Sequence, residues 1–293
     1  MIIFFAGGGL GNQIFQYAFL KTIAKENELI VSTNMKQLVD TFELKNRNFK
    51  QISLNRFQRK LINSYFKRYI LETLVKLKLI GYIKQDKNKK TFIPNFISKK
   101  GFFPITLVES HYFQSEVFFD KNVLNIKIKE RFILQAKSIL DSIPITQTKV
   151  FVHVRRGDYL FEEYLGEIGI ELPNKYFLDA IEIMKKKVEN PYFIFLSDDL
   201  GYCESLFKKI EDKYISNNDI NVDLALMTLC EYGIVSNSSF SWWGAYLMKN
   251  RKKVIFPKYW LGWRQKIESN PGIQPEWANV IDISSKINKN LFS

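Results

Sequence analysis

The sequence predicts an α/β protein with a doubly wound parallel sheet in its second half, for three reasons. From Lys149 onward, short hydrophobic runs alternate with helical patterns, which is the order expected when helices connect parallel strands. The runs are apolar at nearly every position, as in strands that helices cover on both faces. The first half opens in the same way, with an apolar run, a glycine turn and a helical apolar stripe.

Length and composition agree with a two-domain globular protein. The chain has 293 residues, which is enough for two domains of about 150 residues each. The stretch IPITQT at 143–148 fits a boundary best, so we expect domains over 1–147 and 148–293. With 46% apolar and 25% charged residues, the composition excludes wholesale disorder and a disulfide scaffold.

Each domain has its own set of expected elements. In the first, MIIFFA (1–6), ELIVS (28–32) and ITLVES (105–110) are expected strands, and residues 34–100 predict mainly basic helix because turn signals are few. In the second, we expect strands at 150–154, 192–197, 232–236 and 253–256, and helices at 174–189, 204–210, 222–231 and 240–249.

The chain is expected to be cytoplasmic. Its apolar N-terminus carries no positive charge before Lys21 and is interrupted by polar residues, unlike a signal peptide or a membrane span. Cys203 and Cys230 lack the close spacing of a redox or zinc motif, which favours reduced thiols in the cytoplasm.

The positive charge of the chain is concentrated in one segment. The net charge is +13, and residues 56–100 contain 13 Lys or Arg against Glu72 and Asp86, which leaves +2 for the rest. Apolar residues at four-residue spacing, from Phe57 to Tyr69, indicate a basic amphipathic helix. Such a helix either lies on an anionic membrane at its inner face or packs its apolar side on its own domain.

The stretch HVRRGDYL (153–160) places two arginines at the end of a hydrophobic strand. His153 and Arg155 share one face of that strand because side chains alternate, and Gly157 ends it. Ligands of open parallel sheets bind outside the carboxyl ends of strands. The fork-shaped arginine head suits phosphate oxygens. The alternative is that the arginines form surface ion pairs.

Two further segments support a phosphate site at this edge. In SNSSFS (236–241), serine hydroxyls and the NH groups of a helix that begins near Ser239 can meet a phosphate or simply cap the helix. In FIFLSDDL, Asp198 and Asp199 follow a buried strand and point apart, so they are poorly placed to chelate one metal but could accept hydrogen bonds from a guanine or a ribose. With only two histidines and no Asp-x-Asp spacing, we expect chemistry without a metal or another cofactor.

The amino-terminal turn AGGGLGNQIFQYA is a second candidate ligand loop. Its glycine spacing fails the dinucleotide fingerprint, because Asn12 stands in place of the third glycine, and no Gly-Lys-Ser or Gly-Lys-Thr is present. Gly9 and Gly11 still allow close approach to a ligand, while Asn12 and Gln13 supply donors and acceptors. A purely structural turn is the alternative.

Four motifs together resemble glycosyltransferase family 11, the α-1,2-fucosyltransferases that use GDP-fucose. They are GGLGNQIFQYAF (8–19), HVRRGDY (153–159), FLSDD (195–199) and SNSSFSWWGA (236–245). The resemblance spans almost the whole chain and is weakest over 34–100. It implies a GT-B architecture, with two Rossmann-like domains facing a cleft and the donor bound mainly by the second. It also implies inversion at the anomeric carbon without a required metal.

The resemblance also implies roles for individual residues. Arg155 would contact the β-phosphate, with Arg156 as a neighbouring helper. Guanosine contacts would come from His153, Asp198 and Asp199. The resemblance further implies pyrophosphate contacts by Ser238, Ser239 and Phe240, and an approach of Asn12 to fucose and phosphate.

The expected reaction is transfer of L-fucose to the 2-hydroxyl of a galactose-containing oligosaccharide or lipid-linked glycan. An arginine at the β-phosphate lowers the barrier where charge develops. Asp158 is the candidate base for the acceptor proton. Its alternative role is structural, accepting a hydrogen bond from the glycine turn or holding Arg156. A carboxylate of the first domain, or late proton loss without a base, are further options.

Two other functions stay open at this point. One is a GT-B transferase that uses a different nucleotide sugar. The other is a basic, non-catalytic protein that grips phosphate on a membrane or nucleic acid. Nucleic acid is not an expected partner, because no base-stacking or groove-reading motif accompanies the charge.

Overall fold

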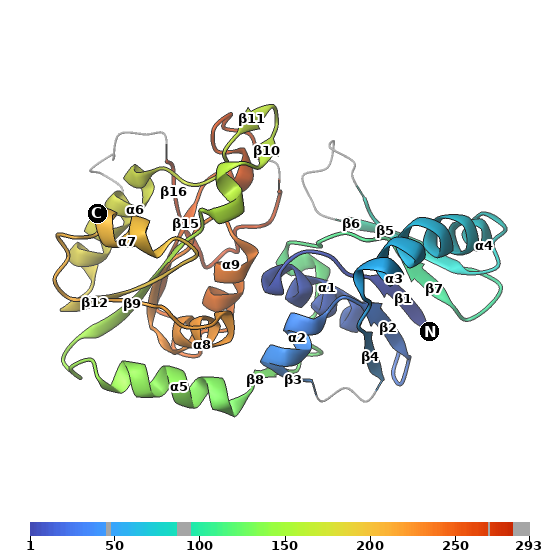
Figure 1. Ribbon diagram of the computed structural model, residues 1–293, viewed down its shortest axis with the longest axis horizontal. Coiled ribbons are helices and arrows are strands. Elements are labelled where there is room, and N and C mark those ends of the chain that lie inside the picture. The colour runs from blue at the N-terminus through green and yellow to red at the C-terminus, as the bar shows by residue number, and fades with distance from the viewer. Residues whose placement is uncertain (45–47, 87–94, 269, 284–293) are drawn as a thin grey trace. The chain divides into compact units, whose positions relative to one another are not determined.

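The computed structural model describes residues 1–44, 48–86, 95–268 and 270–283 (Figure 1). The chain forms two compact units, Met1–Lys129 and Glu130–Ser293. No helix among the described residues is long and apolar enough to cross a membrane.

The boundary between the units precedes the expected one at 147/148, and helix α5 (Glu130–Asp141) is the reason. Its buried residues Phe132, Ala136 and Leu140 are four positions apart and share one face of the helix. This helix packs against α8 (Ile220–Leu229) of the second unit. The residues that lead into the second sheet therefore belong to the second unit.

A six-stranded sheet forms the centre of the first unit, in the order β4-β2-β1-β7-β5-β6. All neighbours are parallel except β5 and β6, which pair antiparallel. The expected strands over 1–6, 28–32 and 105–110 are confirmed. The bounds are β1 Ile2–Phe5, β2 Ile30–Thr33, β4 Phe49–Ile52, β5 Gly81–Asp86, β6 Asn95–Lys99 and β7 Thr106–Val108.

The two faces of this sheet have different covers (Figure 1). Helix α1 (Leu10–Ile23) lies on one face, where its Phe19 stacks on Phe113 and Phe4 approaches the same ring. The opposite face, which carries Phe5, packs against Leu71. That second cover is the helical segment 56–76, composed of α3 (Arg56–Leu61), a π-helical stretch (Ile62–Leu71) and α4 (Glu72–Lys76).

The expectation of mainly basic helix over 34–100 is only partly right. Helix is present in α2 (Lys36–Thr41) and over 56–76, but β4, β5, β6 and the short β3 (Phe42–Leu44) also lie in this range. β3 pairs with β8 (Ile126–Ile128) in a separate two-stranded sheet. These strands were missed because none of them carries a continuous apolar run: β3 and β4 are short, β6 is exposed, and β5 has the mixed sequence GYIKQD.

The second unit contains the doubly wound parallel sheet that the sequence predicts, in the order β13-β12-β9-β14-β15-β16. Every neighbouring pair is parallel. The expected strands are confirmed, whereas the edge strands β13 and β16 were missed. The bounds are β9 Thr148–Val154, β12 Pro191–Ser197, β13 Lys213–Ile215, β14 Tyr232–Ile234, β15 Lys253–Pro257 and β16 Asn279–Ile281.

Four helices connect these strands. They are α6 (Asn174–Lys187), α7 (Leu200–Leu206), α8 and α9 (Ser239–Tyr246). Trp242 and Trp243 of α9 are fully buried. A Cβ on Gly244 would lie 2.5 Å from the sulfur of Met227, so glycine allows α9 to pack closely on α8.

Candidate active site

Three neighbouring strands of the second sheet end at one edge, and polar motifs follow each of them. β9 ends at Val154, β12 at Ser197 and β14 at Ile234. β9 lies between the other two and is parallel to both. Because parallel strands place their carboxyl ends at the same edge, segments far apart in the sequence meet there.

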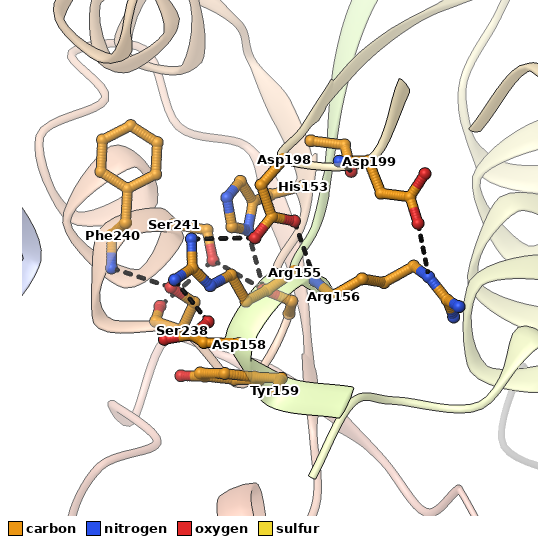
Figure 2. A network of polar contacts seen from close by, with 12 residues as sticks. His153, Arg155, Arg156, Asp158, Tyr159, Asp198, Asp199, Ser238, Phe240 and Ser241 are labelled. Atoms are coloured by element: carbon orange, nitrogen blue, oxygen red, sulfur yellow. Dashed lines mark hydrogen bonds and ion pairs between the residues drawn. The ribbon is translucent and has the colours of Figure 1, made fainter. Parts of the chain in front are cut away.

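Arg155 is held between two carboxylates at this edge (Figure 2). Its Nη2 lies 2.6 Å from Oδ1 of Asp158, and its Nη1 lies 3.0 Å from Oδ2 of Asp198. The guanidinium also lies over the ring of Tyr159, 5.4 Å from the centroid. About a third of the side chain, 34%, is exposed. The arginine head is thus oriented and still accessible to a ligand.

Arg156 is directed away from Arg155 and binds the second aspartate. Its Nε donates to Oδ2 of Asp199 at 3.1 Å, and its guanidinium lies 3.7 Å from the centroid of the Tyr202 ring. Its backbone NH donates to Oδ1 of Asp198 at 2.9 Å. Asp199 also caps α7 by accepting from the Tyr202 NH.

The side chains of the two adjacent aspartates therefore bind different guanidinium groups, Asp198 that of Arg155 and Asp199 that of Arg156. Both oxygens of Asp198 accept from Arg155 and Arg156, and both oxygens of Asp199 accept from Arg156 and the α7 backbone. In this structure they orient the arginines, and their contacts with guanosine remain a prediction. Asp158 forms an ion pair with Arg155. This contact favours the structural role expected as its alternative, but the arginine that it holds is Arg155 and not Arg156.

Gly157 lets Asp198 reach the arginines. A Cβ at this position would lie 2.5 Å from Oδ2 of Asp198, and that carboxylate is the same one that binds Arg155. Glycine is needed here for close approach, not for an unusual backbone angle.

Gly157→Ala is expected to lower the transfer rate by about tenfold, because the displaced Asp198 releases a charge-assisted hydrogen bond to Arg155. Steady-state kinetics with donor and acceptor measure the loss. Gly201→Ala is the matched control, since a Cβ on Gly201 meets nothing within 4 Å. An equal loss in both variants would contradict the steric argument.

His153 is a buried, neutral histidine. The residue is only 6% exposed, and Nδ1 lies 2.8 Å from the Ser236 hydroxyl. Burial, together with the nearby positive charge of Arg155, lowers the pKa of His153 to about 3. The Phe240 ring lies beside it, with the centroids 5.4 Å apart. The imidazole is therefore a neutral hydrogen-bonding group in the buried part of the site.

Acid is expected to destabilise the protein partly through His153. The pKa of about 3 in the folded state lies below the roughly 6.5 of an unfolded histidine, so the unfolded state binds the proton more readily. The stabilising contribution is complete above about pH 6.5 and is lost as pH falls toward the folded pKa. His153→Gln should flatten this part of the curve of unfolding free energy against pH. His111→Gln, at the other histidine, is the control, and an unchanged curve for His153→Gln would contradict the expectation.

The turn between β14 and α9 supplies the third part of the site. α9 begins at Ser239, as expected, and Ser238 caps it by accepting from the Phe240 NH at 3.3 Å. The Ser241 hydroxyl donates to the Ser238 carbonyl. The capping role expected as the alternative is therefore real for Ser238. It leaves the positive end of α9 at the sheet edge, where an anion is stabilised.

Tyr159 connects two parts of the site and was missed as a site residue. Its ring lies against Arg155, and its hydroxyl donates to the Asn237 carbonyl at 3.2 Å. Burial raises the pKa of Tyr159 to about 12. The sequence signal was its place within HVRRGDY, four residues after Arg155. Tyr202, which lies beside Arg156, had no comparable signal.

The amino-terminal turn belongs to the first unit. Gly8 has a φ of 79°, and a Cβ there would lie 2.4 Å from the Asn12 amide nitrogen. Asn12 Oδ1 accepts from Gln114 at 2.7 Å. Gly9 is exposed just before α1.

Two other residues of this turn have structural roles. Gln13 is buried, donates to the Gly8 carbonyl and accepts from the Leu38 NH. Gly11 is buried within α1. These contacts favour a structural role for both, and leave Gly9 and Asn12 as the candidates for ligand contact.

The second unit thus brings most of the expected ligand-binding residues to one edge (Figure 2): His153, Arg155, Arg156, Asp158, Asp198, Asp199, Ser238 and Phe240, and Ser239 as the first residue of α9. Among the described residues, no group of three or more His, Cys, Asp or Glu side chains is arranged to hold a metal ion.

Comparison with known structures identifies the fold. A glycosyl transferase family 9 structure from Veillonella parvula has a TM-score of 0.53 with 16% identity, over 96% of this chain and 84% of that one. At this identity the likeness concerns the fold alone. Each unit has a Rossmann-like sheet, fully parallel in the second unit and parallel except for β6 in the first, so the expected GT-B class is confirmed.

Comparison of sequences identifies the family. The model of glycosyl transferase family 11 matches residues 1–280. An α-1,2-colitosyltransferase of Escherichia coli is 28% identical over 93% of this chain and 96% of its own length. A galactoside α-(1,2)-fucosyltransferase 2 of Sus scrofa is 25% identical over 61% of this chain and 54% of its own length. The chain belongs to glycosyl transferase family 11 and is a glycosyltransferase.

Proposed function

We propose that this glycosyltransferase moves L-fucose from GDP-β-L-fucose to the 2-hydroxyl of a galactose-containing glycan, with inversion and without a metal. The observation that carries the proposal is Arg155, an oriented and accessible guanidinium at the carboxyl end of β9. Membership of family 11 and the likeness to a galactoside fucosyltransferase support the sugar and the acceptor.

In the proposed donor complex, the diphosphate lies between Arg155 and the first turn of α9. Asp158 is 52% exposed, so its ion pair with Arg155 is weak enough for a diphosphate to replace. Asp198 is less exposed, at 26%, and keeps the guanidinium in place. Ser238, Ser239 and Phe240 supply backbone groups at the helix end.

The reaction breaks the bond between the fucose anomeric carbon and a β-phosphate oxygen of GDP. Negative charge grows on the phosphate while the sugar acquires oxocarbenium character, and Arg155 stabilises the phosphate charge. The 2-oxygen of galactose bonds to the opposite face of the anomeric carbon, and its proton passes to a base. Asp158, released from Arg155 by the donor, is the candidate for that base.

A second candidate donor is GDP-colitose, because one relative is a colitosyltransferase. Colitose is fucose without the 3-hydroxyl, so the two donors present the same diphosphate to Arg155. Discrimination between GDP-fucose and GDP-colitose must come from groups that face the sugar. In the first unit, Asn12 is the candidate for such a contact.

The test gives purified protein each donor with a β-galactoside acceptor in the presence of a chelator. The proposal expects GDP-fucose to be consumed, an α-1,2-linked product by NMR, and inhibition by GDP but not UDP. Preference for GDP-colitose would assign the second candidate. Absence of both transfer and donor hydrolysis with either sugar would count against the whole proposal.

The basic segment of the chain suggests where in the cell the reaction takes place. We place it in the cytoplasm near the inner membrane surface, where the basic segment 56–100 contacts anionic lipid. The positive charge concentrated there supports this location.

A further inference from the structure

The first unit contains an apolar cavity that has no part in the donor site. Its volume is about 650 Å³, within the range of small-molecule pockets, which is about 300–1,000 Å³. It lies on the face of the first sheet opposite α1, between β1, β2 and β4 and the helical segment 56–76. Its walls are almost entirely apolar: Met1, Ile3, Phe4, Phe5, Val31, Thr33, Ile52, Leu54, Leu61, Ile62, Phe66, Tyr69 and Ile70.

The cavity exists because the helical segment covers the sheet incompletely. At its C-terminal end, Leu71 is buried and packs with Ile80 and Leu107. At its N-terminal end, the lining residues Leu61, Phe66 and Ile70 are 49%, 42% and 49% exposed. The apolar surface of β1, β2 and β4 therefore opens to the outside through a wall of half-exposed apolar side chains.

The exposure of the basic helix bears on whether its apolar side packs on its own domain or faces a membrane. Two of the residues at four-residue spacing, Phe57 and Tyr69, are 76% and 62% exposed, so most of each ring is not covered by the domain. The segment packs on the core cluster through other residues, Ile62, Leu71, Leu74 and Val75. The exposed apolar side of the helix is thus accessible to a molecule outside the domain.

Three lysines, Lys50, Lys60 and Lys67, lie close in sequence or in space to residues that line this cavity. Lys50 is exposed on β4, two residues from the lining residue Ile52 and therefore on the same face of that strand. The Lys67 ammonium lies 5.6 Å from the centroid of the Phe5 ring, which lines the cavity. Lys60 is exposed beside Leu61. An apolar interior with lysines nearby is complementary to an amphiphile with an apolar chain and an anionic head.

We propose that this cavity binds one hydrocarbon chain of an anionic membrane lipid, while Lys50, Lys60 and Lys67 contact the lipid headgroups. The cavity removes the chain from water and the lysines supply attraction to negative surface charge. The inference extends the proposed membrane contact to a defined site, and it does not depend on which sugar the enzyme transfers.

Flotation with vesicles tests the site. Wild-type protein should float with phosphatidylglycerol vesicles and much less with phosphatidylcholine vesicles. Ile70→Asn, in the cavity wall, should lower the floated fraction several-fold. Leu77→Asn is the matched control, because Leu77 is 63% exposed and is not a lining residue. Thermal unfolding and transfer to a soluble acceptor should be unchanged in both variants.

A fluorescence experiment separates chain insertion from charge attraction. All five tryptophans of the chain lie between residues 242 and 277, so Phe66→Trp places the first one in the first unit. Lipids with brominated acyl chains should quench the added emission of Phe66→Trp on phosphatidylglycerol vesicles.

Three results would overturn the proposal. They are equal flotation of Ile70→Asn and wild type, absence of quenching in Phe66→Trp, and loss of binding in Lys60→Glu that Ile70→Asn does not share. The last result would mean that charge alone binds the membrane. Since flotation needs no sugar donor, these outcomes are independent of a failure to detect fucosyl transfer.

Discussion

Arg155→Ala is expected to lower kcat by about 10²–10³-fold, the usual cost of removing one preorganised donor from a developing negative charge. The variant loses the guanidinium that faces the departing diphosphate. It also leaves the Asp158 and Asp198 carboxylates without the guanidinium that pairs with both, and this adds repulsion toward the diphosphate. Single-turnover kinetics with GDP-fucose separate this loss from a change in acceptor binding.

Arg264→Ala is the matched control for this prediction. Arg264 has the same side-chain exposure as Arg155, 34%, and it pairs with Glu171. It should retain wild-type kcat. If Arg155→Ala keeps more than about a tenth of wild-type kcat while Arg264→Ala behaves as expected, the phosphate role of Arg155 is wrong.

Asp198→Asn is expected to lower kcat/KM by about tenfold to a hundredfold. The carboxylate accepts from the Arg155 guanidinium and from the Arg156 backbone NH. Each hydrogen bond to a charged group contributes about 1.5–3 kcal/mol, and the lower part of that range applies because Asp198 is partly exposed. Loss of the charge lets Arg155 move away from the position that the diphosphate requires.

Asp179→Asn is the control for Asp198→Asn. Asp179 is 24% exposed, against 26% for Asp198, and it also forms an ion pair, with Lys175. Kinetics and thermal unfolding of both variants should show a kinetic loss for Asp198→Asn alone. A loss that appears only in KM for GDP-fucose, with kcat unchanged, would instead support the guanosine contact that the family resemblance implies for this residue.

The donor half of the site was predictable because its motifs follow strands with strong signals. β9 and β12 are continuous apolar runs, and parallel strands must end at a common edge, so His153, Arg155 and Asp198 were expected to meet. The partners within that edge were not predictable. That Asp158 pairs with Arg155 instead of Arg156, and that Tyr159 reaches the Asn237 carbonyl, depends on the path of a short turn.

The first unit was less predictable, for a physical reason. Its edge strands β4 and β6 are short, β4 is half-exposed and β6 is exposed throughout, so their sequences lack the apolar runs on which strand prediction depends. The position of the unit boundary could not be predicted either, because it follows from the packing of α5 (Glu130–Asp141) on α8 (Ile220–Leu229), which are distant in the sequence.

The sequence by itself determined the α/β class, the parallel order of the second half and the arginine, aspartate and serine groups at its edge. Local periodicity and strand-end chemistry are encoded within a few neighbouring residues. Only the tertiary structure decided which carboxylate holds which arginine, that Gln13 is used internally, and that the helix over 56–76 leaves a cavity on the sheet. Each of these depends on contacts between residues distant in the chain, whose distances no local pattern contains.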